Sequence, residues 1–204
     1  SVIMRDNKIL EVTNCDLAVI GAEVIDAKGM YVVPGGVEIH IHGGGGCDFM
    51  EGTEEAFRGA IKAHMKHGTT SIFPTLSSST VPMIEAAAEV CTKLMSEPNS
   101  PVLGLHLEGH YLNMAMAGGQ IPENIKNPDP KEYIPLVEKW NCIKRWDAAP
   151  ELPGAMQFGK YITSKGILAS VAHTQAEYDD IHTARKNGYT HATHFYNAMP
   201  GFHK

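Results

Sequence analysis

Two histidines separated by one residue are the first chemical signal in the sequence. Residues 37–42 alternate apolar and polar side chains, which is the period of a β-strand, so His40 and His42 share one face. Four glycines at 43–46 follow and predict a turn with little side-chain bulk. Paired imidazoles beside such a loop are typical of a catalytic metal site, although a half-buried strand also carries histidines as polar packing residues.

Three more residues could complete that site, because each ends a later predicted strand. Residues 102–108 alternate leucines with other residues, so Glu108 shares a face with His106. A carboxylate on an otherwise buried strand is costly without a cation or a partner. Zinc and iron take several nitrogen and oxygen ligands from histidine and acidic side chains. The candidate metal ligands are therefore His40, His42, Glu108, His173 and His194.

The other histidines fit structural positions better than ligand positions. We expect His106 to be a packed, hydrogen-bonded interior residue. His64 and His67 end a predicted helix, where a solvated cation suits the helix dipole. His182 is expected on an exposed helix face, and His191 is expected to pack on the side of its strand opposite His194.

The elements that must position these residues change in character near Pro34. Residues 1–33 predict short strands at 1–4, 8–12, 16–20 and 30–33, with turn residues between them. From Pro34 onward strands alternate with helices. The predicted strands are 37–42, 69–76, 102–108, 142–148, 167–173 and 190–194, and the predicted helices are 54–67, 81–95, 131–140, 154–164 and 176–187.

This alternation predicts a parallel sheet in an α/β fold, either an open doubly wound sheet or a (β/α)8 barrel. The polar residues at the carboxyl ends of the strands favour the TIM-type barrel. A whole barrel takes about 200–250 residues, so we expect an incomplete one. The predicted organisation is part of a small β-sandwich domain over 1–33, then the first six or so βα units over 34–204 of a longer chain.

Composition narrows the class of protein. The chain has 204 residues, 43% of them hydrophobic, and a net charge of −6. It shows no run long enough for a membrane span and no leader, and its basic residues are scattered, so neither a membrane nor nucleic acid is the expected partner. Cys15, Cys47, Cys91 and Cys142 form no CxxC pair, which indicates reduced thiols in the cytoplasm. Cys47 is expected to be a small buried filler.

Four segments carry a family resemblance. They are PGGVEIHIHGGG at 34–45, GLHLEG at 104–109, AHT at 172–174 and ATHFYNAM at 192–199. In this order and spacing they resemble the N-acetylglucosamine-6-phosphate deacetylases of the metal-dependent amidohydrolase superfamily. The paired histidines are common to the superfamily, whereas the second and fourth segments are more specific to the deacetylases.

The resemblance implies roles for individual residues. Glu108, His173 and His194 match the main metal ligands, and His40 and His42 match a pair that helps hold a second metal in some members. One or two divalent ions per subunit, zinc or iron, are therefore implied. The positions that match substrate-binding residues are Gly119, Gln120, Asn197 and Ala198.

Two departures from the family pattern bear on specificity. His110 stands where proline usually follows Glu-Gly, and it could alter the loop or add an imidazole to the site. Gln120 is neutral, so its hydrogen bond to a sugar would be neutral too. The family's general acid/base aspartate, and an arginine that a second subunit donates to the phosphate, match no residue up to Lys204. A homodimer is implied by the resemblance alone.

The implied reaction is hydrolysis of the acetamide of N-acetylglucosamine 6-phosphate to glucosamine 6-phosphate and acetate, in cytoplasmic amino-sugar catabolism. A divalent ion would lower the pKa of water towards about 7 and polarise the carbonyl. Residues 1–204 alone are expected to be inactive. The alternatives are an amidohydrolase acting on a related sugar phosphate or on a ring amide such as dihydroorotate, and an inactive metal- or sugar-phosphate-binding fragment.

Overall fold

A computed structural model describes residues 1–201 of the chain, which divide into two compact units, Ser1–Pro34 and the part from Gly35 onward. The end of the second predicted segment, residues 202–204, lies outside the described residues. In the first unit, β1 (Val2–Arg5) and β2 (Lys8–Val12) form an antiparallel hairpin, as the sequence predicts.

The prediction of further strands at 16–20 and 30–33 is wrong. Both segments are irregular in the structure. Their large apolar side chains, such as Ile20 and Tyr31, are exposed. Alternating apolar residues make a strand only when a neighbouring strand satisfies the backbone hydrogen bonds, and within residues 1–34 the structure shows no such neighbour for these two segments.

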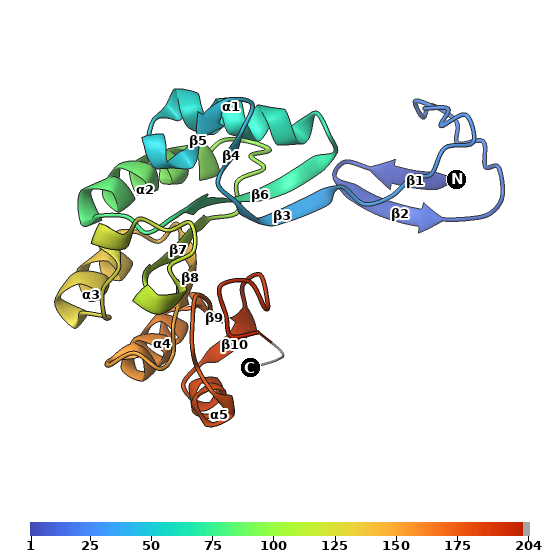
Figure 1. Cartoon of the computed structure of the whole chain (residues 1–204). Coiled ribbons are helices and arrows are strands. Elements are labelled where there is room, and N and C mark those ends of the chain that lie inside the picture. Colours follow the sequence, from blue (N-terminus) through green and yellow to red (C-terminus); the bar gives the residue numbers. More distant parts are fainter. Residues whose placement is uncertain (202–204) are drawn as a thin grey trace. The chain divides into compact units, whose positions relative to one another are not determined.

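The second unit is built on one curved parallel sheet with helices on its outer side (Figure 1). Among the described residues the sheet has six strands in the order β10-β9-β8-β7-β6-β3. Every neighbouring pair is parallel. These strands are β3 (Gly36–Ile41), β6 (Thr69–Leu76), β7 (Leu105–Tyr111), β8 (Ile143–Ala148), β9 (Leu168–Val171) and β10 (Tyr189–Ala192). The predicted α/β fold with an incomplete barrel is confirmed.

Helices cross between successive strands, as right-handed parallel connections require. They are α1 (Glu54–Met65), α2 (Val81–Met95), α3 (Pro130–Lys139), α4 (Ala155–Ser164) and α5 (Tyr178–Lys186). Thr53 caps α1 by accepting a hydrogen bond from the N–H of Ala56 at 3.2 Å, and Pro82 in the first turn starts α2. Within residues 1–201, no helix combines the length and the apolar character needed to cross a membrane.

Strand β7 lies three residues further along the chain than the predicted strand 102–108. Val102 makes only an isolated bridge to Ile72, and the regular ladder begins at Leu105. The strand continues past Glu108 to Tyr111, which pairs with Ala148 of β8. The ladder is irregular between Leu107 and Tyr111, and there the indole N–H of Trp146 donates to the carbonyl of Gly109 at 2.8 Å. All seven residues of β7 are buried, so an amphipathic alternation cannot mark where it ends.

The glycine run after β3 folds into a small hairpin of its own. Strands β4 (Gly43–Gly44) and β5 (Cys47–Asp48) pair antiparallel, and a 3-10 helix follows at Phe49–Glu51. A Cβ placed on Gly43 would lie 2.2 Å from the backbone oxygen of Cys47. The chain itself therefore fills the space beside Gly43, and the missing side chain permits this close backbone contact within the hairpin.

Gly43→Ala is expected to destabilise the protein by about 1–3 kcal/mol, because the new methyl group overlaps backbone atoms that cannot move aside. The midpoint of urea denaturation measures this loss. Gly36→Ala is the matched control, since its Cβ would meet no atom closer than 3.7 Å. Equal midpoints for the two variants would contradict the predicted clash.

Aromatic side chains form the centre of the core between β7, β8 and the outer helices. The rings of Trp146 and Tyr111 stack with centroids 5.6 Å apart and planes 12° apart. Phe158 of α4 packs edge-on against Trp146 at 5.2 Å and against Tyr111 at 5.1 Å. This cluster anchors β7 and β8 side by side. Short 3-10 helices at Met114–Met116 and Pro122–Asn124 lie in the connection that follows β7.

Candidate metal centre

Four imidazole rings surround the carboxylate of Glu108, which is only 3% exposed. Oε1 of Glu108 lies 3.1 Å from Nε2 of His173 and 2.8 Å from Nε2 of His194. Oε2 lies 2.9 Å from Nε2 of His42 and 3.7 Å from Nε2 of His40. The structure therefore brings all five predicted ligands together, with two histidines facing each carboxylate oxygen.

The parallel strands explain this convergence, because their carboxyl ends meet at one end of the barrel. His40 lies within β3 and Glu108 within β7, whereas His173 follows β9 and His194 follows β10. Both histidines after the strand ends have left-handed backbone, with φ of 44° at His173 and 30° at His194. Such backbone is unfavourable for residues other than glycine and is concentrated at functional sites.

Backbone and side-chain partners orient three of the rings. Nδ1 of His173 lies 2.7 Å from the carbonyl oxygen of Met116, and Nδ1 of His194 lies 3.1 Å from that of Asn197. Nδ1 of His42 lies 3.3 Å from Oγ of Ser77. Metal-binding histidines usually donate their second ring N–H in this way, which leaves Nε2 free to bind a cation.

The positive partners at the site oppose the effect of burial on the pKa of Glu108. Burial alone would raise the pKa of Glu108, but its hydrogen bonds to His173 and His42 and the charge of the nearby rings hold that pKa well below its ordinary value. Glu108 is therefore an anion at neutral pH. Burial lowers the pKa of His40 to about 4. His40 is therefore neutral near pH 7, which is the form that binds metals.

The donor chemistry fits divalent cations. Two groups of three ligand atoms share Glu108: His40 and His42 with one, His173 and His194 with the other, and in each group the atoms lie within 4.8 Å of one another. Nitrogen donors around one bridging carboxylate suit zinc and iron and are unsuited to calcium or magnesium, which prefer oxygen. These residues could hold one ion in either group or two ions that share the carboxylate.

The positions predicted to bind substrate lie beside this cluster. A Cβ placed on Gly118 would be 3.5 Å from the His173 ring and 3.8 Å from the Cβ of Ala198, so the loop that carries Gly119 adjoins the loop that carries Ala198. The side chain of Asn197 is exposed. Gly119 is also exposed.

Gln120 is held firmly at the same place. It is 8% exposed, and its Oε1 accepts a hydrogen bond from the backbone N–H of Ser78 at 2.6 Å. Its amide oxygen is therefore occupied by the loop after β6, and its amide N–H groups are the atoms that could face a ligand.

Comparison with known proteins decides the family. A model of the amidohydrolase family matches residues 31–204. The chain belongs to the amidohydrolase family. The family resemblance drawn from the four motifs is thereby confirmed at this level, and the amidohydrolase family is one of metal-dependent enzymes, in agreement with the donor set around Glu108.

Individual relatives of this amidohydrolase carry one name. The chain is 29% identical to the N-acetylglucosamine-6-phosphate deacetylase of Lysinibacillus sphaericus, over 98% of this chain and 52% of that protein. It is 33% identical to the enzyme of that name from Bacillus subtilis, over 84% of this chain and 45% of the relative. The chain thus spans about half the length of the curated relatives it matches.

A solved structure shows the same similarity in three dimensions. This amidohydrolase superimposes with a TM-score of 0.78 and 30% identity on an N-acetyl-D-glucosamine-6-phosphate deacetylase mutant from Mycobacterium smegmatis in complex with N-acetyl-D-glucosamine-6-phosphate. The match covers 82% of this chain and 44% of that one. The matched part of this chain therefore has the fold of the corresponding part of a known deacetylase.

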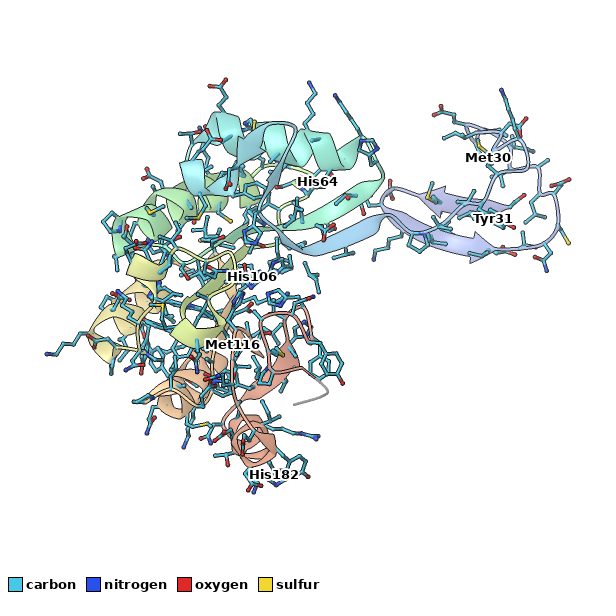
Figure 2. The ribbon with its side chains drawn as sticks, in the orientation of Figure 1. Met30, Tyr31, His64, His106, Met116 and His182 are labelled. Carbon is cyan, nitrogen blue, oxygen red and sulfur yellow. The ribbon has the colours of Figure 1, made fainter. Side chains whose placement is uncertain are left out.

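The other histidines among residues 1–201 lie outside the cluster around Glu108. His106 is fully buried among the side chains inside the sheet, and His182 is exposed on the outer helix α5, both as expected (Figure 2). His64 differs from the expectation of a solvated helix end, since it is half-buried and its Nε2 lies 2.9 Å from the carbonyl oxygen of Gly43. His110 is fully buried, with Nε2 2.6 Å from Glu132 on α3. It therefore supports a helix and adds no imidazole to the candidate site.

Sequence reasoning missed two charged residues at the base of the site. Arg145 and Asp147 of β8 are 4% and 0% exposed, and Asp147 contacts the buried ring of His106. Their signal in the sequence is a pair of charges on an otherwise buried strand, the same argument that singled out Glu108. The four cysteines form no disulfide in the part of the chain described here; Cys91 and Cys142 are buried, while Cys47 is half-buried and Cys15 is exposed.

His67→Ala is expected to leave the metal content of the protein unchanged, because His67 is exposed beyond the end of α1 and contacts no candidate ligand. Elemental analysis of the purified protein measures the content. His42→Ala is the matched comparison and should reduce the amount of metal bound. A loss of metal in His67→Ala would show that α1 also contributes a ligand.

Proposed function

We propose that the protein is a metal-dependent hydrolase that removes the acetyl group of N-acetylglucosamine 6-phosphate, giving glucosamine 6-phosphate and acetate. One observation carries the proposal. Four imidazoles converge on both oxygens of the buried Glu108 at the carboxyl ends of barrel strands, in a chain whose relatives are named deacetylases of this sugar phosphate.

The metal ligands in this proposal are His40, His42, Glu108, His173 and His194. A divalent ion bound there supplies a Lewis acid for the amide carbonyl and lowers the pKa of water. Glu108 contributes the negative charge, and the half-buried, neutral His40 contributes a nitrogen donor that protons do not occupy near pH 7. The carbonyl groups of Met116 and Asn197 keep the rings of His173 and His194 in their orientation.

The sugar phosphate would lie against the loops next to His173. Gly119 leaves room for a ligand, with no atom within 4 Å of a Cβ placed there. Gln120 is fixed by its bond to Ser78 and would donate its amide N–H to the sugar. Asn197 and Ala198 are the proposed phosphate contacts, through the side-chain amide and the backbone N–H.

Several finer features are proposed with this function. The metal is zinc or iron, with one or two ions per subunit; residues 1–33 are part of a small β domain, and residues 34–204 are the first six or so βα units of the barrel. The general acid/base aspartate and a phosphate-binding arginine come from chain outside residues 1–204. The active protein is a cytoplasmic homodimer in amino-sugar catabolism.

The test measures acetate release from N-acetylglucosamine 6-phosphate by the protein as it is naturally encoded. The enzyme is first stripped with a chelator and then reloaded with zinc or ferrous iron. Turnover is expected only after reloading, because Glu108 and the histidines bring no Lewis acid of their own. The unphosphorylated sugar should react far more slowly, since it lacks the group that the loop at 197–198 would bind.

Three outcomes would contradict the proposal. Hydrolysis of dihydroorotate without hydrolysis of the sugar phosphate would indicate a ring-amide hydrolase. Faster reaction with the galacto epimer would change the substrate. Bound metal with no acetate release from any acetylated amino-sugar phosphate would leave a binding protein without this activity.

A further inference from the structure

A layer of buried polar residues lies directly beneath the metal ligands, on the inner side of the sheet. Its members come from β6, β7, β8, β9 and the residue after β10, and none is more than 4% exposed. They are Thr75, His106, Arg145, Asp147, Ser170 and Thr193. Buried polar groups on this scale are costly unless they satisfy one another, so the layer must be a connected network.

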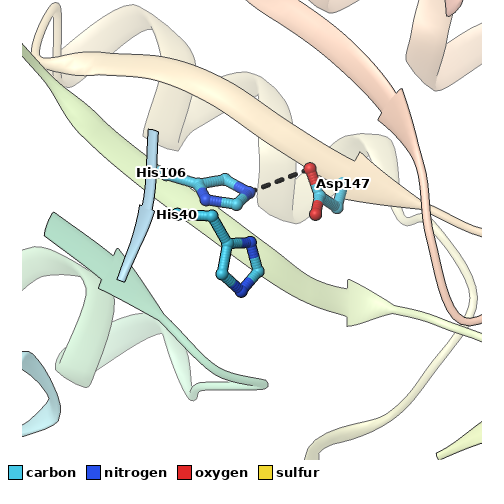
Figure 3. A group of neighbouring side chains, drawn as sticks. All are labelled: His40, His106 and Asp147. Carbon is cyan, nitrogen blue, oxygen red and sulfur yellow. Dashed lines mark ion pairs between the residues drawn. The ribbon is translucent and has the colours of Figure 1, made fainter. Parts of the chain in front are cut away.

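Asp147 is the centre of this network. Its Oδ1 lies 2.9 Å from Nε2 of His106 (Figure 3). The same oxygen accepts a hydrogen bond from Nε of Arg145 at 3.3 Å. Its Oδ2 accepts from the hydroxyl of Thr193 at 2.5 Å. Burial would raise the pKa of Asp147, but His106, Arg145 and Thr193 outweigh it and lower that pKa, so the carboxylate is charged.

The network forms hydrogen bonds with the backbone on both sides of His40. Nη1 of Arg145 donates to the carbonyl oxygen of Ile39 at 3.0 Å. The backbone N–H of Ile41 donates to Oγ1 of Thr75 at 3.0 Å, and that same hydroxyl lies 3.1 Å from Nδ1 of His106. Both neighbours of His40 in the chain are therefore bonded to the layer.

The orientation of the His40 ring depends on these backbone hydrogen bonds more than the orientations of the other proposed ligands do. Among the described residues its Nδ1 is buried without a hydrogen-bond partner, whereas His42, His173 and His194 each have a partner for Nδ1. The position of the His40 ring therefore rests on the backbone that Arg145 and Thr75 hold.

The layer also reaches two other ligands through the chain. His106 lies two residues before Glu108 on β7, and Thr193 immediately precedes His194. The hydroxyl of Thr193 forms hydrogen bonds with Arg145 and Asp147. It also lies 2.8 Å from the hydroxyl of Ser170 on β9. A single network on β8 is thus linked to the strands that carry His40, Glu108 and His194.

The layer is unsuited to a cation of its own. Ligand atoms of His40, His106 and Asp147 do lie within 4.8 Å of one another. However, the guanidinium of Arg145 already neutralises Asp147, and Thr75 and Thr193 occupy further atoms of the group. A second positive charge there would be repelled by Arg145 at close range.

We infer that Asp147 and Arg145 are positioning residues, which hold β3, β7 and β10 against β8 so that His40, Glu108 and His194 stay at metal-binding distance. This inference rests on the proposed metal site. It assigns to two charges outside the ligand set the role of outer partners, whose loss typically weakens metal binding about 10–100-fold.

The test compares the metal affinity of Asp147→Asn with that of the unmodified protein, both as naturally encoded, by competition with a chromogenic chelator for zinc. The variant keeps the size of the side chain and removes its charge. We expect affinity to fall about 10–100-fold, and the absorption spectrum of the cobalt-loaded protein to change, while circular dichroism shows an unchanged fold.

Leu94→Ala is the control for a general loss of stability. Leu94 is a buried core residue of α2, a helix that carries none of the proposed metal ligands. Its truncation should lower stability and leave zinc affinity and the cobalt spectrum unchanged. An equal fall in affinity for Leu94→Ala would overturn the inference, because a general loss of stability would then explain both results.

A second pair of variants decides the matter if Asp147→Asn does not fold. Thr193→Val keeps the shape of the side chain and removes the hydroxyl between Arg145 and Asp147, so zinc affinity should fall; Thr193→Ser restores the hydroxyl and should restore affinity. Unchanged affinity in Thr193→Val, or no tight zinc binding in the unmodified protein, would overturn the inference. Tight zinc binding without acetate release would instead contradict the proposed function alone.

Discussion

Glu108→Ala is expected to abolish tight metal binding in the protein as naturally encoded. Glu108 is the one anionic member of the ligand cluster, and its two oxygens face all four histidines. Its removal leaves neutral nitrogen donors that no longer share a common ligand. We expect metal affinity to fall by more than about 100-fold, the upper end of what the loss of an outer-shell partner costs. Elemental analysis after dialysis measures the bound metal directly.

Glu138→Ala is the control for this prediction. Glu138 is an exposed carboxylate on α3, paired with Lys165 and far from the ligand cluster in the chain. It removes the same charge without touching a ligand, so its metal content should equal that of the unmodified protein. Stoichiometric metal retained by Glu108→Ala would refute the assignment of Glu108 as a ligand.

Trp146→Ala is expected to cost about 3–5 kcal/mol of stability, the range for truncating a large buried aromatic side chain. Trp146 is fully buried, contacts the rings of Tyr111 and Phe158, and donates its indole N–H to the carbonyl of Gly109. Truncation leaves a large cavity and an unsatisfied carbonyl next to Glu108. Denaturant unfolding with the metal present measures the loss.

The second tryptophan provides the comparison. Trp140 at the end of α3 is only partly buried, so Trp140→Ala should cost clearly less. Trp146→Phe fills most of the cavity but cannot donate to Gly109, and it therefore separates packing from the hydrogen bond. Equal losses for Trp146→Ala and Trp140→Ala would contradict the view that the cluster around Trp146 is the centre of the core.

Much of the barrel follows from local pattern. Strand β6 and helix α2 have the predicted bounds because a turn or a capping residue stands at each end of a clear apolar pattern. Strand β7 does not, because every residue from Leu105 to Tyr111 is buried and no alternation marks its limits. The segments at 16–20 and 30–33 look like strands, but strand formation needs a pairing partner, and a single segment carries no information about one.

The candidate site also has residues that could be predicted from the sequence and residues that could not. The convergence of the five candidate ligands could be predicted because histidine and glutamate at strand ends have few structural uses, and because the four motifs resemble those of a known family. The roles of Arg145 and Asp147 could not, because they depend on contacts with Ile39, His106 and Thr193, which come from other strands. Only the folded sheet shows which buried charges are partners.

The left-handed backbone at His173 and His194 has a consequence for the stability of the folded protein. At these two positions the chain adopts a shape that glycine or asparagine would accept with less strain. The proposed metal binding requires histidine at these two positions, whereas glycine or asparagine there would relieve backbone strain and favour stability. A descendant of this protein that no longer needed the metal could carry glycine or asparagine at both positions, and its folded backbone would be less strained there.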